Sequence, residues 1–276
     1  MTSPRASLSR AGKSVLALAI TLTFLFPLLW AFSASFQTTR ELYEPSPSLL
    51  PPHPTLENYA RAFQDQIGPL STSLVVAVLS TVLCLLIAVP AAYALSSFGW
   101  RWTGLVILAL LVTQMVPSVM VTTPLYLLFS KLGLLNSITG LVLADSAAGV
   151  PFAILVLRAF IADIPGELRE AALIDGAGEM RVLRSVILPV ARSGVVAVSI
   201  FCFLFAWGDF LNALTLNTND TVRPLSLSLY QYFGQYLVDW GAVMATAMIA
   251  VAPGAVLLLV TQRYIAAGLT AGSVKG

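Results

Sequence analysis

Six long apolar segments constrain this chain more than any other feature. Each carries few charged residues, and a helix of about 20 apolar residues crosses a bilayer core about 30 Å thick. None alternates with the period of two that membrane β-barrel strands show. The segments are Val15–Phe36, Ser73–Leu95, Thr103–Phe129, Ile138–Phe160, Val195–Leu216 and Ala242–Ile265. The sequence therefore predicts an all-α, polytopic membrane protein with six transmembrane helices.

The composition supports a membrane location. Apolar residues make up 58% of the 276 residues and charged residues only 10%, whereas a soluble domain carries about 25% charged residues. So few charges cannot cover an apolar core of this size with a polar shell. The net charge of +2 also gives no basic excess for nucleic acid.

Basic residues are distributed unequally between the loops on the two sides. One side holds eleven Lys and Arg residues and the other holds only Arg40, Arg61, Lys131 and Arg223. By the positive-inside rule, both termini and the loops near residue 100 and at 161–191 are expected to be cytoplasmic. The expected organisation is a basic cytoplasmic tail at 1–14 and a transmembrane domain at 15–276, with an external loop at 37–70. The first apolar segment is longer than a usual signal-peptide core, which favours an uncleaved span over a secretory signal.

Residue types needed for hydrolytic catalysis or metal binding are scarce. His53 is the only histidine, so the sequence offers no HExxH zinc site and no Ser-His-Asp triad. Gly12-Lys13-Ser14 matches only the end of a phosphate-binding loop. Cys84 and Cys202 lie inside predicted spans and are expected to pack as apolar residues. We expect no catalytic residue, no metal and no cofactor in this chain.

The 161–191 loop contains a readable helical pattern. Asp163 is expected to cap a short helix that begins at Pro165, and Glu167 suits its positive N-terminal end. Leu168, Ala171 and Ala172 recur at helical spacing, and Asp175-Gly176 breaks the helix. A second helical piece is expected from Glu179 to Ile187, ending before Pro189 because proline disfavours helix in the preceding residue. Such a helix suits docking to another protein, although it could also pack only on its own spans.

These residues resemble the EAA loop of permease subunits of binding-protein-dependent ABC importers, in the sugar-permease branch related to the maltose-transporter permeases. Several residues at fixed distances carry the resemblance, which extends over nearly the whole chain. The matching segments are Glu170-Ala171-Ala172, Asp175-Gly176-Ala177, Ile187-Leu188-Pro189, Pro54-Thr55-Leu56-Glu57-Asn58-Tyr59, Trp207-Gly208-Asp209-Phe210, and the tail Gln262-Arg263-Tyr264, Gly268-Leu269-Thr270-Ala271-Gly272 and Lys275-Gly276. The family often has a further proline after Leu188-Pro189, where this chain has Arg192-Ser193.

The resemblance implies that the loop is a coupling helix seated in a cleft of a separate ATPase. Glu170 would then contact a basic group of the ATPase, Ala171 and Ala172 would permit close packing, and Gly176 would set the turn. The implied coupling residues are Glu170, Ala171, Ala172, Asp175, Gly176, Leu188 and Pro189. The implied partners are a second permease subunit in a heterodimer, cytoplasmic ABC ATPase subunits and an external solute-binding protein.

Polar residues inside the spans are candidates for the solute pathway, because a charged group in hydrocarbon is costly. Asp145 and Asp209 could accept hydrogen bonds from sugar hydroxyls, with Trp207 as a stacking face and Gln114 as a further contact. The alternatives are helix–helix hydrogen bonding and, for Trp207, an aromatic belt at the interface. Prolines within the spans favour kinks: Pro90, Pro117, Pro124, Pro151 and Pro253.

The sequence thus favours a non-catalytic, multi-pass permease of the inner (cytoplasmic) membrane that imports a sugar or polyol. The nearest alternative within transport is the same architecture carrying glycerol phosphate or another non-sugar solute. An ion-coupled secondary transporter with Asp145 and Asp209 as carriers is a third possibility.

Overall fold

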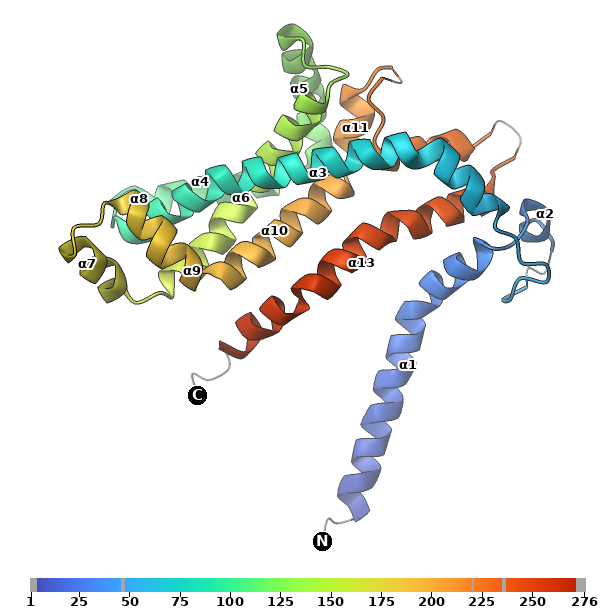
Figure 1. The fold of residues 1–276 in the computed structure, drawn as a ribbon, viewed down its shortest axis with the longest axis horizontal. Helices are drawn as coiled ribbons and strands as arrows, with labels where there is room; N and C mark the ends of the chain where they lie inside the picture. Colours follow the sequence, from blue (N-terminus) through green and yellow to red (C-terminus); the bar gives the residue numbers. More distant parts are fainter. Residues whose placement is uncertain (1–3, 46–47, 220, 235–236, 272–276) are drawn as a thin grey trace. The chain divides into compact units, whose positions relative to one another are not determined.

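A computed structural model describes residues 4–45, 48–219, 221–234 and 237–271, with side chains between residues 12 and 262. Apart from one isolated bridge between Phe233 and Val238, the regular structure of these residues is helical (Figure 1). The expected all-α class is confirmed. The elements are α1 (Pro4–Ala34), α2 (Thr39–Leu42), α3 (Glu57–Ser97), α4 (Thr103–Met115), α5 (Ser118–Leu132), α6 (Ile138–Ala162), α7 (Gly166–Ile174), α8 (Glu179–Val182), η1 (Leu183–Ile187), α9 (Leu188–Val190), α10 (Arg192–Trp207), α11 (Leu211–Leu216), α12 (Leu225–Ser228), η2 (Leu229–Tyr232) and α13 (Trp240–Ala271).

Two predicted boundaries differ from these elements. α1 begins at Pro4, inside the expected tail 1–14, and α3 begins at Glu57, inside the expected external loop 37–70. Gly272, Lys275 and Gly276 of the tail motif, like residues 1–3, lie outside the described residues.

Four described helices are long and apolar enough to cross a membrane, and up to six spans result if each of two bent helix pairs counts as one. The four are Gly12–Ala34, Glu57–Ser97, Ile138–Ala162 and Trp240–Gln262. The expected number of six matches the upper count, although the second bent pair joins Glu179–Val190 to Arg192–Trp207 at 84° and so differs in bounds from the predicted fifth span.

The third predicted span is not one continuous helix. α4 and α5 meet at an angle of 96°, and Val116 between them is extended, with φ −75° and ψ 121°. Pro117 explains the break, because its ring disfavours helical backbone at the preceding residue and it has no N–H to donate. A kink at Pro117 was expected, and the structure shows a break between two helices there. Six other prolines of the described residues lie inside these continuous helices: Pro27, Pro69, Pro90, Pro124, Pro151 and Pro253.

The fifth predicted span is also interrupted. α10 ends at Trp207 and α11 begins at Leu211. The carboxylate of Asp209 accepts the backbone N–H groups of Asn212 at 3.4 Å and Ala213 at 3.0 Å. These are the free amides of a new helix start, and an acidic group there stabilises it. Asp209 therefore starts a second helix where the sequence predicted one span over 195–216.

The chain divides into two compact units, which are described separately. Of the described residues, the first unit comprises those between 4 and 67 and between 229 and 252, and the second comprises those between 68 and 228 and between 253 and 271.

The second unit contains the 161–191 loop and all four candidate pathway residues. α6 is the most buried of its long helices and packs against α10, α4 and α11. Its core cluster includes Ala153, Ile154 and Leu157 of α6 together with Val198 and Cys202 of α10. Small side chains such as Ala153 let the helix backbones approach closely, which is typical of membrane helix packing.

The first unit explains part of the motif at 54–59. The Asn58 amide, 1% exposed, donates to the carbonyl oxygens of Ser35 at 3.0 Å and Gln37 at 2.7 Å. Arg61 donates to Asp239 at 2.6 Å, which ties the start of α3 to the residue before α13. These polar residues hold the connections between helices in place and are bonded to other parts of the same chain.

Candidate functional site

The first helix of the 161–191 loop is present as predicted, with a different cap. α7 runs from Gly166 to Ile174 with Pro165 as its N-cap, and no side chain caps it. The expected cap, Asp163, instead lies at the C-terminal end of α6. Pro165 is extended, with φ −56° and ψ 128°. The extended residue separates Asp163 from the first turn of α7, so the Asp163 side chain does not cap that helix. The prediction for Asp163 was wrong.

The predicted break after α7 is confirmed. α7 ends at Ile174 with Asp175 as its C-cap, and Gly176 has φ +83°. That left-handed conformation is readily adopted by glycine and rarely by other residues. The backbone N–H of Gly176 donates to Leu173 and that of Ala177 donates to Ala172, both at 3.0 Å. The turn is therefore hydrogen-bonded and depends on residue 176 having no side chain.

α7 has two faces of different character. Ala172 and Leu173 are partly buried and pack against the core of the second unit. Glu170 and Ala171 are exposed, and Ile174 is 85% exposed. The exposed face thus presents a carboxylate, a small residue and a large apolar side chain, a combination that suits protein contact.

The second helical piece extends further than the sequence predicted. α8, η1 and α9 form a run from Glu179 to Val190 that includes Pro189. The prediction of an end before Pro189 was wrong. η1 is a π-helical turn, and its wider hydrogen-bonding pattern accommodates a proline that has no N–H to donate. Leu188 packs on the core while Pro189 is exposed.

One contact cluster in this region was not found from the sequence. The hydroxyl of Tyr93, in α3, donates to Glu179 Oε2 at 2.5 Å. Arg169 donates from Nε to Glu179 Oε2 at 3.2 Å and from Nη2 to Glu179 Oε1. Its guanidinium also lies 5.4 Å from the ring centre of Phe98. We call Tyr93, Arg169 and Glu179 the loop clamp. Because these residues are 10 to 86 positions apart, no local motif reveals the cluster.

The candidate pathway residues lie on α4, α6 and α10 and in the link between α10 and α11. Asp145, in α6, is 3% exposed and accepts a hydrogen bond from the Asn212 side chain at 2.9 Å. Asn212 also donates its backbone N–H to Asp209, so the structure brings the two acids together around Asn212, which the sequence analysis missed. Trp207 stacks on Phe203 with ring centres 5.8 Å apart. Gln114 is exposed in the last turn of α4.

The two cysteines pack inside the core of the second unit, as predicted. Both thiols are free and buried, and their sulfur atoms are 3.2 Å apart. Among the residues whose side chains are described, no group of three or more His, Cys, Asp or Glu could hold a metal ion.

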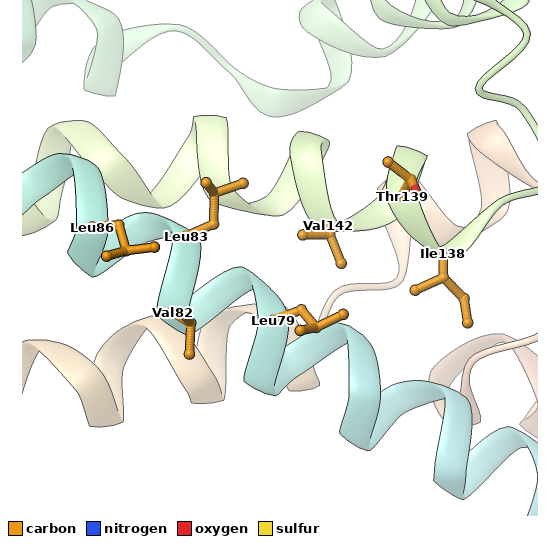
Figure 2. A pocket seen from close by; sticks show the side chains of 7 residues that line it. All are labelled: Leu79, Val82, Leu83, Leu86, Ile138, Thr139 and Val142. Carbon is orange, nitrogen blue, oxygen red and sulfur yellow. The ribbon is translucent and has the colours of Figure 1, made fainter.

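An open hollow of about 300 Å³ lies between α3 and the start of α6. Figure 2 shows its lining side chains, Leu79, Val82, Leu83, Leu86, Ile138, Thr139 and Val142. All but Thr139 are apolar, so this hollow offers little hydrogen bonding to a polyhydroxylated solute. It does not compete with the candidate pathway residues as a solute site.

The comparison with protein families decides the identity of the fold. The model for the binding-protein-dependent transport system inner membrane component matches residues 85–271. The chain belongs to this family. The predicted resemblance is confirmed, and this permease is a transport subunit and a multi-pass protein of the inner membrane. Membership favours a binding-protein-dependent transporter over an ion-coupled carrier.

Curated relatives match nearly the whole permease. The sulfoquinovosyl glycerol transport permease SmoH of Agrobacterium fabrum is 35% identical, covering 100% of this chain and 98% of that protein. The diacetylchitobiose uptake permease NgcG of Streptomyces coelicolor is 36% identical, covering 90% and 83%. The trehalose transport permease SugB of Mycobacterium tuberculosis is 34% identical, covering 91% and 93%.

Solved structures show the same fold at lower identity. A chain from a bacterial ABC transporter that imports the polysaccharide alginate superimposes with a TM-score of 0.82 and 22% identity, covering 96% of this permease and 99% of that chain. A chain from the MetNI methionine transporter gives a TM-score of 0.58 and 16% identity, covering 75% and 97%. The polytopic permease fold is therefore shared.

Proposed function

We propose that this chain is the membrane-spanning permease subunit of an ATP-driven, binding-protein-dependent importer of a carbohydrate, either a sugar or a polyol. It forms half of the translocation pathway beside a second, different permease subunit. The relatives named for sulfoquinovosyl glycerol, diacetylchitobiose and trehalose support this solute class. The chain itself is non-catalytic, and ATP is hydrolysed by partner subunits.

The exposed face of α7 carries the proposal most directly. Both termini and the 161–191 loop are cytoplasmic in this proposal, so α7 is the coupling helix that docks into the ATPase. Glu170 meets a basic group there, Ala171 allows close approach of the ATPase, Ala172 allows close packing of α7 on its own core, and Gly176 sets the turn. The full coupling set is Glu170, Ala171, Ala172, Asp175, Gly176, Leu188 and Pro189. Support comes from the face that α7 leaves uncovered, with Ile174 85% exposed.

Closure of the ATPase pair around ATP would move α7 and, through the core contacts of Ala172 and Leu173, the spans behind it. Such a movement favours an outward-open pathway over an inward-open one. An external solute-binding protein delivers the solute to the outward-open state. ATP binding thus changes the population of two states of the bundle rather than driving chemistry in this chain.

Solute contacts in this proposal come from Asp145, Asp209, Trp207 and Gln114. The hydrogen bonds around Asn212 also give Asp145 and Asp209 a structural role. Exposure distinguishes Gln114 from them, because its amide can reach a solute without breaking an internal bond.

Substitution separates solute contact from structural support. We expect Gln114→Leu to raise the solute concentration for half-maximal uptake about fivefold without changing the melting temperature, since a missing hydrogen bond weakens binding by about 1 kcal/mol. Thr113→Val, one residue earlier on the same helix, is the control. Unchanged uptake in Gln114→Leu, measured with radiolabelled solute, would remove Gln114 from the pathway.

Reconstitution tests the function as a whole. The permease is co-expressed with its partners, purified as a complex, and placed in liposomes with ATP inside and the binding protein outside. We expect uptake of a sugar or polyol, chosen from a thermal-shift panel on the binding protein, that requires hydrolysable ATP. Uptake that needs an ion gradient and no ATPase would refute the proposal.

An anionic solute such as glycerol phosphate is the competing outcome of the same panel. A negatively charged cargo needs basic groups along its external path, and Arg40, Arg61, Lys131 and Arg223 were the candidates. Arg61 already pairs with Asp239, which leaves it less able to hold an anion.

A further inference from the structure

The loop clamp lies on three separate segments of the second unit. Tyr93 belongs to α3, Arg169 to α7 and Glu179 to α8. The Tyr93 side chain is 4% exposed and belongs to the core cluster, so its hydroxyl is held at a fixed position. That fixed hydroxyl donates to Glu179 at 2.5 Å and accepts from Arg169 at 3.3 Å. One core residue therefore holds both charged residues of the loop.

The clamp also has the geometry of a strong ion pair. Arg169 uses two of its nitrogen atoms on the two oxygen atoms of Glu179, the forked arrangement that gives both direction and strength. The rings of Phe98 and Tyr93 lie edge to face with centres 5.8 Å apart, and Phe98 lies beneath the guanidinium. The hydrogen bonds from Arg169 and Tyr93 hold the pKa of Glu179 below its ordinary value, so the carboxylate stays charged at neutral pH.

Without the clamp, α7 would be joined to the bundle mainly by its two ends and its apolar face. The end at Pro165 is extended, and the other end passes through Gly176 and Gly178. Such connections allow a nine-residue helix to tilt. Movement of a partner bound to the exposed face of α7 would then rotate α7 alone and would not move α3.

We propose that Tyr93, Arg169 and Glu179 are positioning residues that lock α7 to α8 and to the end of α3, so that movement of the docked ATPase is transmitted to α3. The inference rests on the proposed coupling role of α7 and adds the residues through which the movement passes. Glu170 and Ala171 contact the ATPase in that role, whereas the clamp acts behind them.

The test uses the whole complex in lipid nanodiscs and compares ATP hydrolysis with and without the solute-loaded binding protein. We expect Arg169→Met, Glu179→Gln and Tyr93→Phe each to lower the stimulation by the binding protein about fivefold. The melting temperature and the amount of ATPase that co-purifies should stay unchanged. The double variant Arg169→Met/Glu179→Gln should be no worse than either single variant, because both remove the same interaction.

Matched controls come from the same loop. Arg181→Met and Arg184→Met remove a charge from exposed residues outside the clamp and outside α7, and should leave stimulation at the wild-type level. Full stimulation in the clamp variants, or an additive double variant, would overturn the inference. Loss of stimulation in strict proportion to lost ATPase subunits would also overturn it, since that result indicates a role in assembly alone.

A second measurement does not depend on the partners. Hydrogen–deuterium exchange of the amides at 166–177 is followed in this permease alone in nanodiscs. We expect about fivefold faster exchange in Glu179→Gln than in wild type or Arg181→Met, because α7 opens more often once the clamp is released. Equal exchange would refute the clamp. Failure of the wild-type complex to show ATP-driven uptake would instead refute the proposed function.

Discussion

We expect Gly176→Pro to lower ATP-driven uptake about a hundredfold while the permease still folds and inserts. Gly176 has φ +83°, whereas proline fixes φ near −65° and removes an N–H, at a cost of about 3 kcal/mol or more. The lost N–H is the one that donates to Leu173 at 3.0 Å. The turn after α7 must therefore reorganise, and α7 presents a different face to the ATPase. Uptake into liposomes reports this directly.

Two alanine variants test whether the loss of uptake comes from the backbone conformation at residue 176 and not from replacing any glycine in this turn. Gly176→Ala places a side chain where φ is positive, and Gly178→Ala places one at φ −74°, with no atom within 4 Å of the new Cβ. Uptake should fall in Gly176→Ala and stay at the wild-type level in Gly178→Ala. Wild-type uptake by Gly176→Pro would count against α7 as the coupling element.

The second large effect is expected at the contact between α10 and α6. A Cβ on Gly194 would lie 2.5 Å from Cγ and 2.8 Å from Cβ of Phe160, closer than packed carbon atoms approach each other. Overpacking of this kind costs about 1–3 kcal/mol. We expect Gly194→Leu to lower the melting temperature of the purified permease by about 5 °C or more.

The same substitution in open space provides the comparison. Gly104, at the start of α4, has no atom within 4 Å of an added Cβ, so Gly104→Leu should melt close to wild type. Adding Phe160→Ala to Gly194→Leu should recover part of the loss, because the smaller side chain makes room. A wild-type melting temperature for Gly194→Leu would show that α10 and α6 are less tightly packed than described.

The features predicted from the sequence are those that depend on local pattern. The length of the apolar segments predicted where the spans lie, and the Asp175-Gly176 pair predicted where α7 ends. Breaks inside spans were harder to predict, because Pro117 ends a helix while Pro90 and Pro151 lie within helices. A proline in a membrane helix can be accommodated by neighbouring groups, and the sequence around each proline does not report those neighbours.

Contacts between distant residues could not be predicted from one sequence. Arg61 and Asp239 are 178 positions apart, and Tyr93 and Glu179 are 86 positions apart. Which charged residues meet depends on how the helices pack, and periodicity within a segment carries no information about that. Asn212 shows the same limit, because its role comes from the position of Asp145 on another helix.

The 96° bend between α4 and α5 has a consequence for the membrane in which the permease lies. If the two helices form one span, the extended backbone at Val116 lies at hydrocarbon depth, where lipid cannot hydrogen-bond to peptide groups. Irregular backbone at such depth persists only against protein or water. The bend must therefore face a neighbouring subunit or an aqueous cavity. In this permease without its partner subunits, backbone groups at the bend would meet lipid that cannot hydrogen-bond to them.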